Sequence, residues 1–386
     1  MTTSTARRQQ VAQVFQQRFG TQPALWARAP GRVDLMGSHT DYNLGYVLTL
    51  PIGRDTWIAA NPRPDRNVRL YSLNLDAENA FSLDHLVADN VQRWSNYPRG
   101  VASVLQHGGR KLCGFDGVLH STVPISSGLS SSAALECVTA VVFQALGGWR
   151  LEPVEMALLC QRAENQFVGV QCGILDQYTA CLGQEGCALL LDCRDLSSRP
   201  VTLAPGVQVV ICDTRSKREL SGSEYGTRRA QCEQGALQLG VLALRDVSLA
   251  EFGRSESQLP REVAQRCRFI IEENERVLRL AEALAAGHRA AIRQLTAASF
   301  RGACELYEIG APAMHAMMDA MLGGPGIIGA RQAGAGFGGC MVAFVERDKV
   351  DSFAGSVREA YCAAAQTQPE VFPVEAAAGA EVMAKL

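Results

Sequence analysis

The sequence Pro-Ile-Ser-Ser-Gly-Leu-Ser-Ser-Ser-Ala occupies residues 124–133, and an apolar stretch with helical spacing follows it to Leu146. A loop of small residues that runs into a helix leaves several backbone N–H groups without intrahelical partners, and the helix dipole adds positive character at the same end. Gly128 lets a ligand approach the backbone closely, and the serines offer hydroxyl groups to phosphate oxygens or to a metal ion. The stretch therefore predicts an anion site, and a serine-rich N-cap on an ordinary core helix is an equally good interpretation. It is not a Walker loop, because the lysine and spacing of that motif are absent.

The composition is that of an ordinary globular protein: 386 residues, 47% of them hydrophobic and 20% charged, a length that favours two domains. A net charge of −2 gives no electrostatic case for nucleic acid or a membrane surface. The 13 cysteines include no Cys-x-x-Cys pair, which argues against zinc and suits a reducing compartment. Because the chain also has no apolar segment of signal-peptide or membrane-spanning length, we expect a cytoplasmic protein.

A second informative segment, Gly31–Asn43, reads Gly-Arg-Val-Asp-Leu-Met-Gly-Ser-His-Thr-Asp-Tyr-Asn and is dense in polar and turn residues. Alternating residues predict strands at Tyr46–Pro51 and Thr56–Ala60 after it. Buried polar groups need partners, so a polar segment next to apolar strands points to a ligand site. The alternative is a capping and turn segment with scattered charges.

Two further segments contain candidate functional groups. Asp176 lies among apolar neighbours, so its carboxylate needs a cation or a hydrogen-bond donor nearby; a helix-capping aspartate is the alternative. Residues 323–339 are rich in glycine and end in Ala-Gly-Ala-Gly-Phe-Gly-Gly. Glycine at this density costs chain entropy, which indicates a close backbone approach to a ligand or another loop rather than a flexible hairpin tip.

The three motifs at 31–43, 124–133 and 334–339 stand in the order found in the sugar and small-molecule kinases of the GHMP family, which this chain therefore resembles. The branch it resembles most is the galactokinases, whose signature Gly-Arg-x-x-Leu-x-Gly-x-His-Thr-Asp-Tyr-Asn matches residues 31–43. Residues 163–177 and 190–194 also look like that branch, so the resemblance covers nearly the whole chain. Each glycine motif alone would be weak evidence; the ordered set is specific.

The resemblance implies an α+β kinase with two lobes. Residues 1–198 would form an N-terminal lobe like ribosomal protein S5 domain 2, and residues 199–386 a ferredoxin-like C-terminal lobe with the glycine-rich loop. The implied reaction transfers the γ-phosphoryl group of ATP to the anomeric hydroxyl of galactose, giving α-galactose 1-phosphate and ADP, with Mg²⁺ as cofactor. The sugar and ATP would be the partners and would meet between the lobes. No motif sets the oligomeric state, and a monomer is compatible with all of them.

The resemblance also implies roles for individual residues. Asp176 and Arg32 would be catalytic, beside the anomeric hydroxyl. The sugar would be bound by Ser38, His39, Thr40, Asp41, Gly173 and Tyr225. The nucleotide phosphates would be held by Ser126, Ser127, Gly128, Leu129, Ser130, Ser131 and Ser132, and magnesium by Ser132 and Glu164.

These roles are chemically reasonable on their own. Phosphoryl transfer needs in-line positioning and charge neutralisation more than covalent chemistry, and magnesium needs only a few hard oxygen ligands from the protein. Asp176 could accept the proton of the sugar hydroxyl as a base, or it could orient that hydroxyl while Arg32 stabilises charge in the transition state. The sequence leaves both open. The Asp41 carboxylate suits paired sugar hydroxyls, because it accepts several hydrogen bonds.

Ser38 is the main departure from the galactokinase pattern, which generally has glutamate there, near C6 of the sugar. Serine is shorter and neutral, so we expect altered tolerance at C6: galacturonate would escape like-charge repulsion, and arabinose, which lacks C6, would lose less. A smaller departure is Asp34, where asparagine is usual. The first alternative function is therefore a 1-kinase for such a sugar. The second, a non-catalytic sugar sensor, is disfavoured because Ser130–Ser132, Glu164 and Asp176 are all present.

Overall fold

The computed structural model describes residues 4–125, 127–216 and 221–384. The α-helices are α1 (Ser4–Phe19), α2 (Asn96–His107), α3 (Ser131–Gly147), α4 (Pro153–Ala163), α5 (Leu175–Leu182), α6 (Ser221–Leu239), α7 (Leu249–Ser255), α8 (Arg261–Ala286), α9 (Arg289–Glu305), α10 (Pro312–Leu322) and α11 (Val350–Ala365). The strands are β1 (Leu25–Met36), β2 (Tyr46–Pro62), β3 (Asn67–Ser72), β4 (Ala77–Ser82), β5 (Phe115–Ser121), β6 (Cys187–Asp192), β7 (Ser198–Thr202), β8 (Val207–Asp213), β9 (Ile327–Gln332), β10 (Cys340–Glu346), β11 (Glu370–Val374) and β12 (Glu381–Val382). Single turns of 3₁₀ helix lie at Asp41–Asn43, Arg93–Ser95, Leu244–Asp246, Glu256–Gln258 and Arg347–Lys349, and a π-helical turn at Glu164–Val168.

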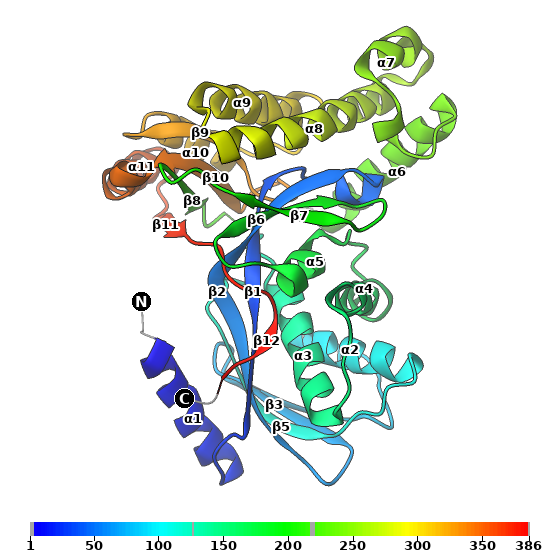
Figure 1. Ribbon diagram of the computed structural model, residues 1–386, viewed down its shortest axis with the longest axis vertical. Helices are drawn as coiled ribbons and strands as arrows, with labels where there is room; N and C mark the ends of the chain where they lie inside the picture. Colours follow the sequence, from blue (N-terminus) through cyan, green and yellow to red (C-terminus); the bar gives the residue numbers. More distant parts are fainter. Residues whose placement is uncertain (1–3, 126, 217–220, 385–386) are drawn as a thin grey trace.

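An eight-stranded sheet forms the first layer of the molecule (Figure 1). Its main path is β12–β1–β2–β5–β3–β4, and β6 and β7 continue from β2. Helices α2 to α5 cover one face of this sheet, and α1 lies on the other. Every residue of α3 from Ala133 to Phe143 is buried, because α3 lies between the sheet and the neighbouring helices. That position explains why the stretch is apolar on all sides.

A second, antiparallel sheet has the order β11–β8–β10–β9 and has helices on both faces. Alternate residues of β8 face opposite layers: Val209 and Ile211 share a core with α8 and α9, while Val210 and Cys212 share one with α10 and α11. A strand buried on both faces reads as a continuous apolar run, which is the pattern of this segment. The predicted α+β class is confirmed, with two sheets.

Segments far apart in the chain meet in the first sheet. β7 begins at Ser198 and pairs with β6, and β12, near the end of the chain, pairs with β1. Residues after 198 therefore contribute to both sheets, and the division into 1–198 and 199–386 stays a prediction.

The sugar-signature segment begins as a strand rather than as a turn. Residues 25–36 pair with β2, and the two predicted strands at 46–51 and 56–60 are one continuous strand. The polar residues between them suggested a break, but the ladder continues through a bulge opposite Gly31.

Among the described residues, none of the helices combines the length and apolarity that a membrane span requires.

Candidate active site

The predicted phosphate loop ends at the N-terminus of α3, beside Asp176. Ser130 precedes the helix with a left-handed backbone, φ 61°, and Gly128 also has a positive φ of 91°. A non-glycine residue in this conformation persists only where its neighbours hold it. The Ser130 hydroxyl donates a hydrogen bond to Asp176 Oδ2 at 2.6 Å, which joins loop and carboxylate directly. Ser126 lies outside the described residues.

Strand β1 brings Arg32 to this loop through the bulge at Gly31. A Cβ atom on residue 31 would lie 2.7 Å from the carbonyl oxygen of Leu129, so only glycine lets the strand pass this close. The Arg32 backbone N–H donates to that same oxygen at 3.1 Å, and its Nη1 donates to the Gly128 carbonyl at 2.6 Å. These bonds hold Arg32 against the phosphate loop, where its guanidinium group also reaches Asp176.

Arg32 and Asp176 form an ion pair at the centre of the site. Nε and Nη2 of Arg32 lie 2.8 Å and 2.5 Å from Asp176 Oδ1. The arginine side chain is 8% exposed and the aspartate 26%, so the pair is open on its carboxylate side. Asp176 lies in the first turn of α5, where the helix dipole favours a negative charge. Among the described residues, Ser130 is the one hydrogen-bond donor to Oδ2, and a carboxylate oxygen can accept a further hydrogen bond from a bound hydroxyl.

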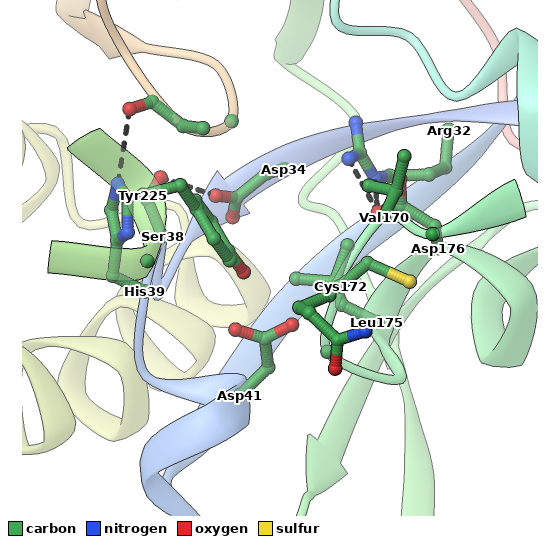
Figure 2. Close-up of a pocket in the computed structure, with 16 residues that line it drawn as sticks. Arg32, Asp34, Ser38, His39, Asp41, Val170, Cys172, Leu175, Asp176 and Tyr225 are labelled. Carbon is green, nitrogen blue, oxygen red and sulfur yellow. Dashed lines mark hydrogen bonds and ion pairs between the residues drawn. The ribbon is translucent and has the colours of Figure 1, made fainter. Parts of the chain in front are cut away.

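A cavity of about 440 Å³ opens beside this pair (Figure 2). Four parts of the chain line it: β1 with the turn after it, the segment that leads into α5 with the first turn of that helix, the start of α6, and the glycine-rich loop. The lining residues are Arg32, Asp34, Ser38, His39, Asp41, Gly169, Val170, Gln171, Cys172, Gly173, Leu175, Asp176, Tyr225, Gly226, Gly334 and Ala335. The glycine-rich loop packs against the segment between α9 and α10: the Phe337 N–H donates to the Ile309 carbonyl at 2.8 Å, and a Cβ atom on Gly336 would lie 2.6 Å from the same oxygen. The predicted close approach of that loop to another is confirmed.

Asp41 reaches the cavity only because residue 173 is glycine. A Cβ atom at residue 173 would lie 1.8 Å from Asp41 Oδ2. Burial raises the pKa of Asp41 to about 7, and the charges of Asp176 and Asp34 add to the rise against the opposing Tyr42 N–H. Asp41 is therefore a carboxylate short of donors, in a cavity that can admit a polyhydroxylated ligand.

Thr40, a predicted sugar-binding residue, is not among the residues that line the cavity. Its side chain is fully buried, and its hydroxyl lies 2.6 Å from the carbonyl oxygens of Gly37 and Tyr46. These bonds hold the turn, and its contact with a sugar stays a prediction. His39 does line the cavity, but its ring nitrogens lie 2.8 Å from the Tyr42 hydroxyl and 3.0 Å from the Ala335 carbonyl oxygen. The His39 ring therefore connects Tyr42 and the glycine-rich loop at the wall of the cavity.

Ser38 lines the cavity, but its hydroxyl already has two partners. It donates to Asp34 Oδ2 at 2.5 Å and accepts from Arg331 Nη2 at 3.1 Å. The expectation that serine removes the negative charge from this corner overlooked Asp34, which also lines the cavity and supplies a carboxylate four residues earlier. Burial raises the pKa of Asp34, against the lowering effect of Arg331 and Ser38. The only signal for Asp34 in the sequence was its departure from the usual asparagine.

The two residues predicted to hold magnesium lie together. Glu164 is 5% exposed; burial and the charge of Asp176 raise its pKa, while hydrogen bonds with Cys172, Gln177 and Ser132 lower it. A buried carboxylate beside another carboxylate suits a cation. No cluster of three or more His, Cys, Asp or Glu side chains able to hold a metal occurs in the described part of the chain. This donor set fits Mg²⁺, which takes most of its ligands from phosphates and water.

A second cavity, of about 290 Å³, opens beside the first turn of α3. It is lined by Thr56, Ser72, Asn74, Leu75, Trp94, Tyr97, Leu119, Ser121, Ile125, Ser131, Ser132 and Leu135. Trp94 and Tyr97, from the segment that enters α2, give it an aromatic wall beside the serines. The sequence analysis missed both aromatic residues, because no local motif marks them.

Fold and site define a small-molecule kinase of the GHMP class. Residues 96–184 match the family described as "GHMP kinases N terminal domain", and residues 13–62 match "Galactokinase galactose-binding signature". The galactokinases of Chloroflexus aggregans and Chloroflexus aurantiacus are 45% and 43% identical over 376 and 373 residues, each alignment covering 95% of both chains. The crystal structure of Lactococcus lactis galactokinase complexed with galactose superposes with a TM-score of 0.91 at 30% identity, covering 96% of this chain and 98% of that one. The chain belongs to the galactokinase family.

Proposed function

We propose that this protein transfers the γ-phosphoryl group of ATP to the anomeric hydroxyl of galactose, giving α-galactose 1-phosphate and ADP. The observation that carries the proposal is that the Arg32–Asp176 pair and the sugar-signature carboxylate Asp41 line one cavity, while the phosphate loop is hydrogen-bonded to that pair through Ser130 and Gly128. The 43–45% identity to galactokinases over nearly the whole chain supports the same activity.

The nucleotide would lie along the phosphate loop with its base in the second cavity. The loop offers backbone N–H groups and serine hydroxyls to phosphate oxygens, and an aromatic wall suits a flat base. Mg²⁺ would be held by Ser132 and Glu164, where it neutralises phosphate charge. Asp176 lies close enough to Glu164 for its negative charge to raise the pKa of Glu164. A bound cation would reduce this repulsion between the two carboxylates.

At the sugar end, Asp176 Oδ2 accepts the hydrogen bond of the anomeric hydroxyl, and Arg32 faces the incoming phosphoryl group. Arg32 holds Asp176 Oδ1 by two donors and the loop carbonyl of Gly128 by a third, so its position depends on both partners. Such preorganised charge needs no rearrangement when the transition state forms. Asp41 would accept hydroxyls of the ring, and Tyr225, from α6, would form part of the cavity wall around the sugar.

A coupled assay of ADP release with a sugar panel tests the function, and two variants test the role of Asp176. Asp176→Asn keeps the size and hydrogen-bonding shape of the side chain but loses its basicity. If Asp176 is a base, Asn and Ala lower turnover alike, by about 100- to 10,000-fold. If it mainly orients the hydroxyl, Asn keeps much more activity than Ala. No ADP release with galactose from the wild type would refute the proposal.

We also propose that the protein works in the cytoplasm. Its 13 cysteines are all free thiols, which persist in a reducing compartment. Galactose and ATP are the proposed partners.

A further inference from the structure

Asp34 has one carboxylate oxygen without a partner at the wall of the sugar cavity. The residue is 1% exposed and lines the cavity. Its Oδ2 accepts from Ser38 at 2.5 Å and lies 3.8 Å from Arg331 Nη1. Its Oδ1 has no hydrogen-bond partner among the described residues. A buried acceptor left unpaired is costly, and the one unpaired donor beside this carboxylate in the described part of the chain, Arg331 Nη1, lies 3.8 Å from the other oxygen, Oδ2.

The direction of the carboxylate is set by a buried network on its other side. Arg331, which is 0% exposed, donates to Ser38 at 3.1 Å, to Ser299 at 3.1 Å and to Glu273 at 3.2 Å. Ser299 in turn donates to Glu273 at 2.7 Å. These contacts fix Oδ2 toward Ser38 and so hold the whole carboxylate in one orientation, which is the kind of support that positions a binding group.

The place of Asp34 along β1 relates it to the reacting end of the cavity. Residues 32 to 34 pair regularly with β2, so Arg32 and Asp34 point to the same face of the strand. Two residues of strand separate their Cα atoms by about 6.6 Å. In Figure 2 the Asp34 carboxylate lies between Ser38 and Arg32, across the cavity from Asp41. A sugar whose anomeric hydroxyl meets Asp176 would therefore present a different hydroxyl to Asp34.

We infer that Asp34 is a specificity-determining residue of the sugar site, and that its Oδ1 accepts a hydrogen bond from a galactose hydroxyl other than the anomeric one. The inference rests on the proposed function. It also accounts for two departures from the galactokinase pattern at once. The carboxylate usual at residue 38 is replaced by serine, and a carboxylate stands at residue 34 in place of asparagine, in hydrogen-bond contact with that serine.

The test is a hydroxyl-deletion scan. kcat/KM is measured for galactose and its 2-, 3-, 4- and 6-deoxy forms with the wild type and with Asp34→Asn. In the wild type one deletion should lower kcat/KM by about 3- to 10-fold, the range for a single ordinary hydrogen bond, because burial raises the pKa of Asp34 and so disfavours its charged form. In Asp34→Asn the penalty for that same deletion should shrink by at least about threefold, while the other three penalties stay the same.

Asp351→Asn is the matched control, because it is the same chemical change at an exposed residue of α11 that does not line the cavity. It should keep the wild-type pattern of penalties. Equal penalties in the wild type and Asp34→Asn for all four sugars would overturn the inference, as would the same shrinkage in Asp351→Asn. Failure of the wild type with galactose itself would instead refute the proposed function.

If Asp34→Asn does not fold, a crystal structure of the wild type with galactose gives the answer. A sugar oxygen within about 3.2 Å of Asp34 Oδ1 supports the inference, and only water or protein at that distance overturns it.

Discussion

Lowering the pH from 8 to 6 should weaken galactose binding, because Asp41 gains a proton in the empty cavity. Burial raises the pKa of Asp41 from its ordinary 3.8 to about 7. Below that pH the side chain is a neutral acid and has to lose its proton before it can accept hydroxyl donors as a carboxylate. Binding is therefore strongest above pH 7 and weakens as the pH falls through that value.

The magnitude follows from the titration. With a pKa of about 7, the ionised fraction falls from roughly 0.9 at pH 8 to roughly 0.1 at pH 6, so the apparent Kd for galactose should rise about tenfold. The raised pKa of Asp41 has the opposite effect on the stability of the empty protein, which falls as the pH rises. The folded protein binds a proton at Asp41 between about pH 4 and 7 while the unfolded chain does not, so the raised pKa destabilises the empty protein at high pH. Asp41→Asn should then be more thermostable than the wild type at pH 8.

Isothermal titration calorimetry with galactose, without ATP, avoids the titration of the nucleotide. Two buffers of different ionisation enthalpy at pH 6.5 should report the release of about 0.8 proton per galactose. Asp41→Asn should bind weakly, with no proton release and no dependence on pH. The reasoning is refuted if the wild-type affinity is flat between pH 6 and 8, or if Asp41→Asn keeps the wild-type pH dependence.

The remaining predictions concern the reaction, the cavity floor, the metal and C6. Asp176→Ala should lower kcat by about 100-fold or more while ATP still binds in a fluorescence titration, and near-normal turnover would remove Asp176 from the reaction. Gly173→Ala should raise KM for galactose and leave KM for ATP unchanged, because the new methyl group would lie 1.8 Å from Asp41 Oδ2; an unchanged galactose KM contradicts the geometry. Glu164→Gln should raise the Mg²⁺ concentration for half-maximal rate without changing galactose affinity in calorimetry, and an unaltered Mg²⁺ requirement would exclude this ligand. Ser38→Glu should lower turnover of galacturonate relative to galactose and arabinose, and an unchanged preference in a three-sugar assay would discard the C6 hypothesis.

Features that depend on neighbours along the chain were predictable. The small-residue loop at 124–133 and the apolar run behind it gave the buried helix α3, because helix period and burial are local patterns. The need for glycine at a close approach was also readable in the loop at 334–339, which does pack against other loops. The family resemblance depended on motifs of this kind, and it was confirmed by the comparisons.

Features that depend on the direction of a single side chain could not be predicted from the sequence. Thr40 matched the sugar signature but points into the turn, whereas Asp34 looked like a small departure and lines the cavity. Trp94 and Tyr97 lie 34 to 38 residues before Ser131 and Ser132, the serines that line the same cavity, and β5 lies between them in the sequence. No spacing rule connects them.

The residue types and their order along the chain predicted the family, which the comparisons confirmed, and with it a serine loop for phosphate, an arginine and a carboxylate for transfer, and a polar signature for a sugar. Which of those polar groups line the cavity was decided by folding, because the surroundings of a side chain depend on its partners in space. Ser38 shows the reason. Its hydroxyl is engaged by Asp34 and by Arg331, the latter 293 residues further along the chain, and only the packing of β9 beside β1 brings that arginine there.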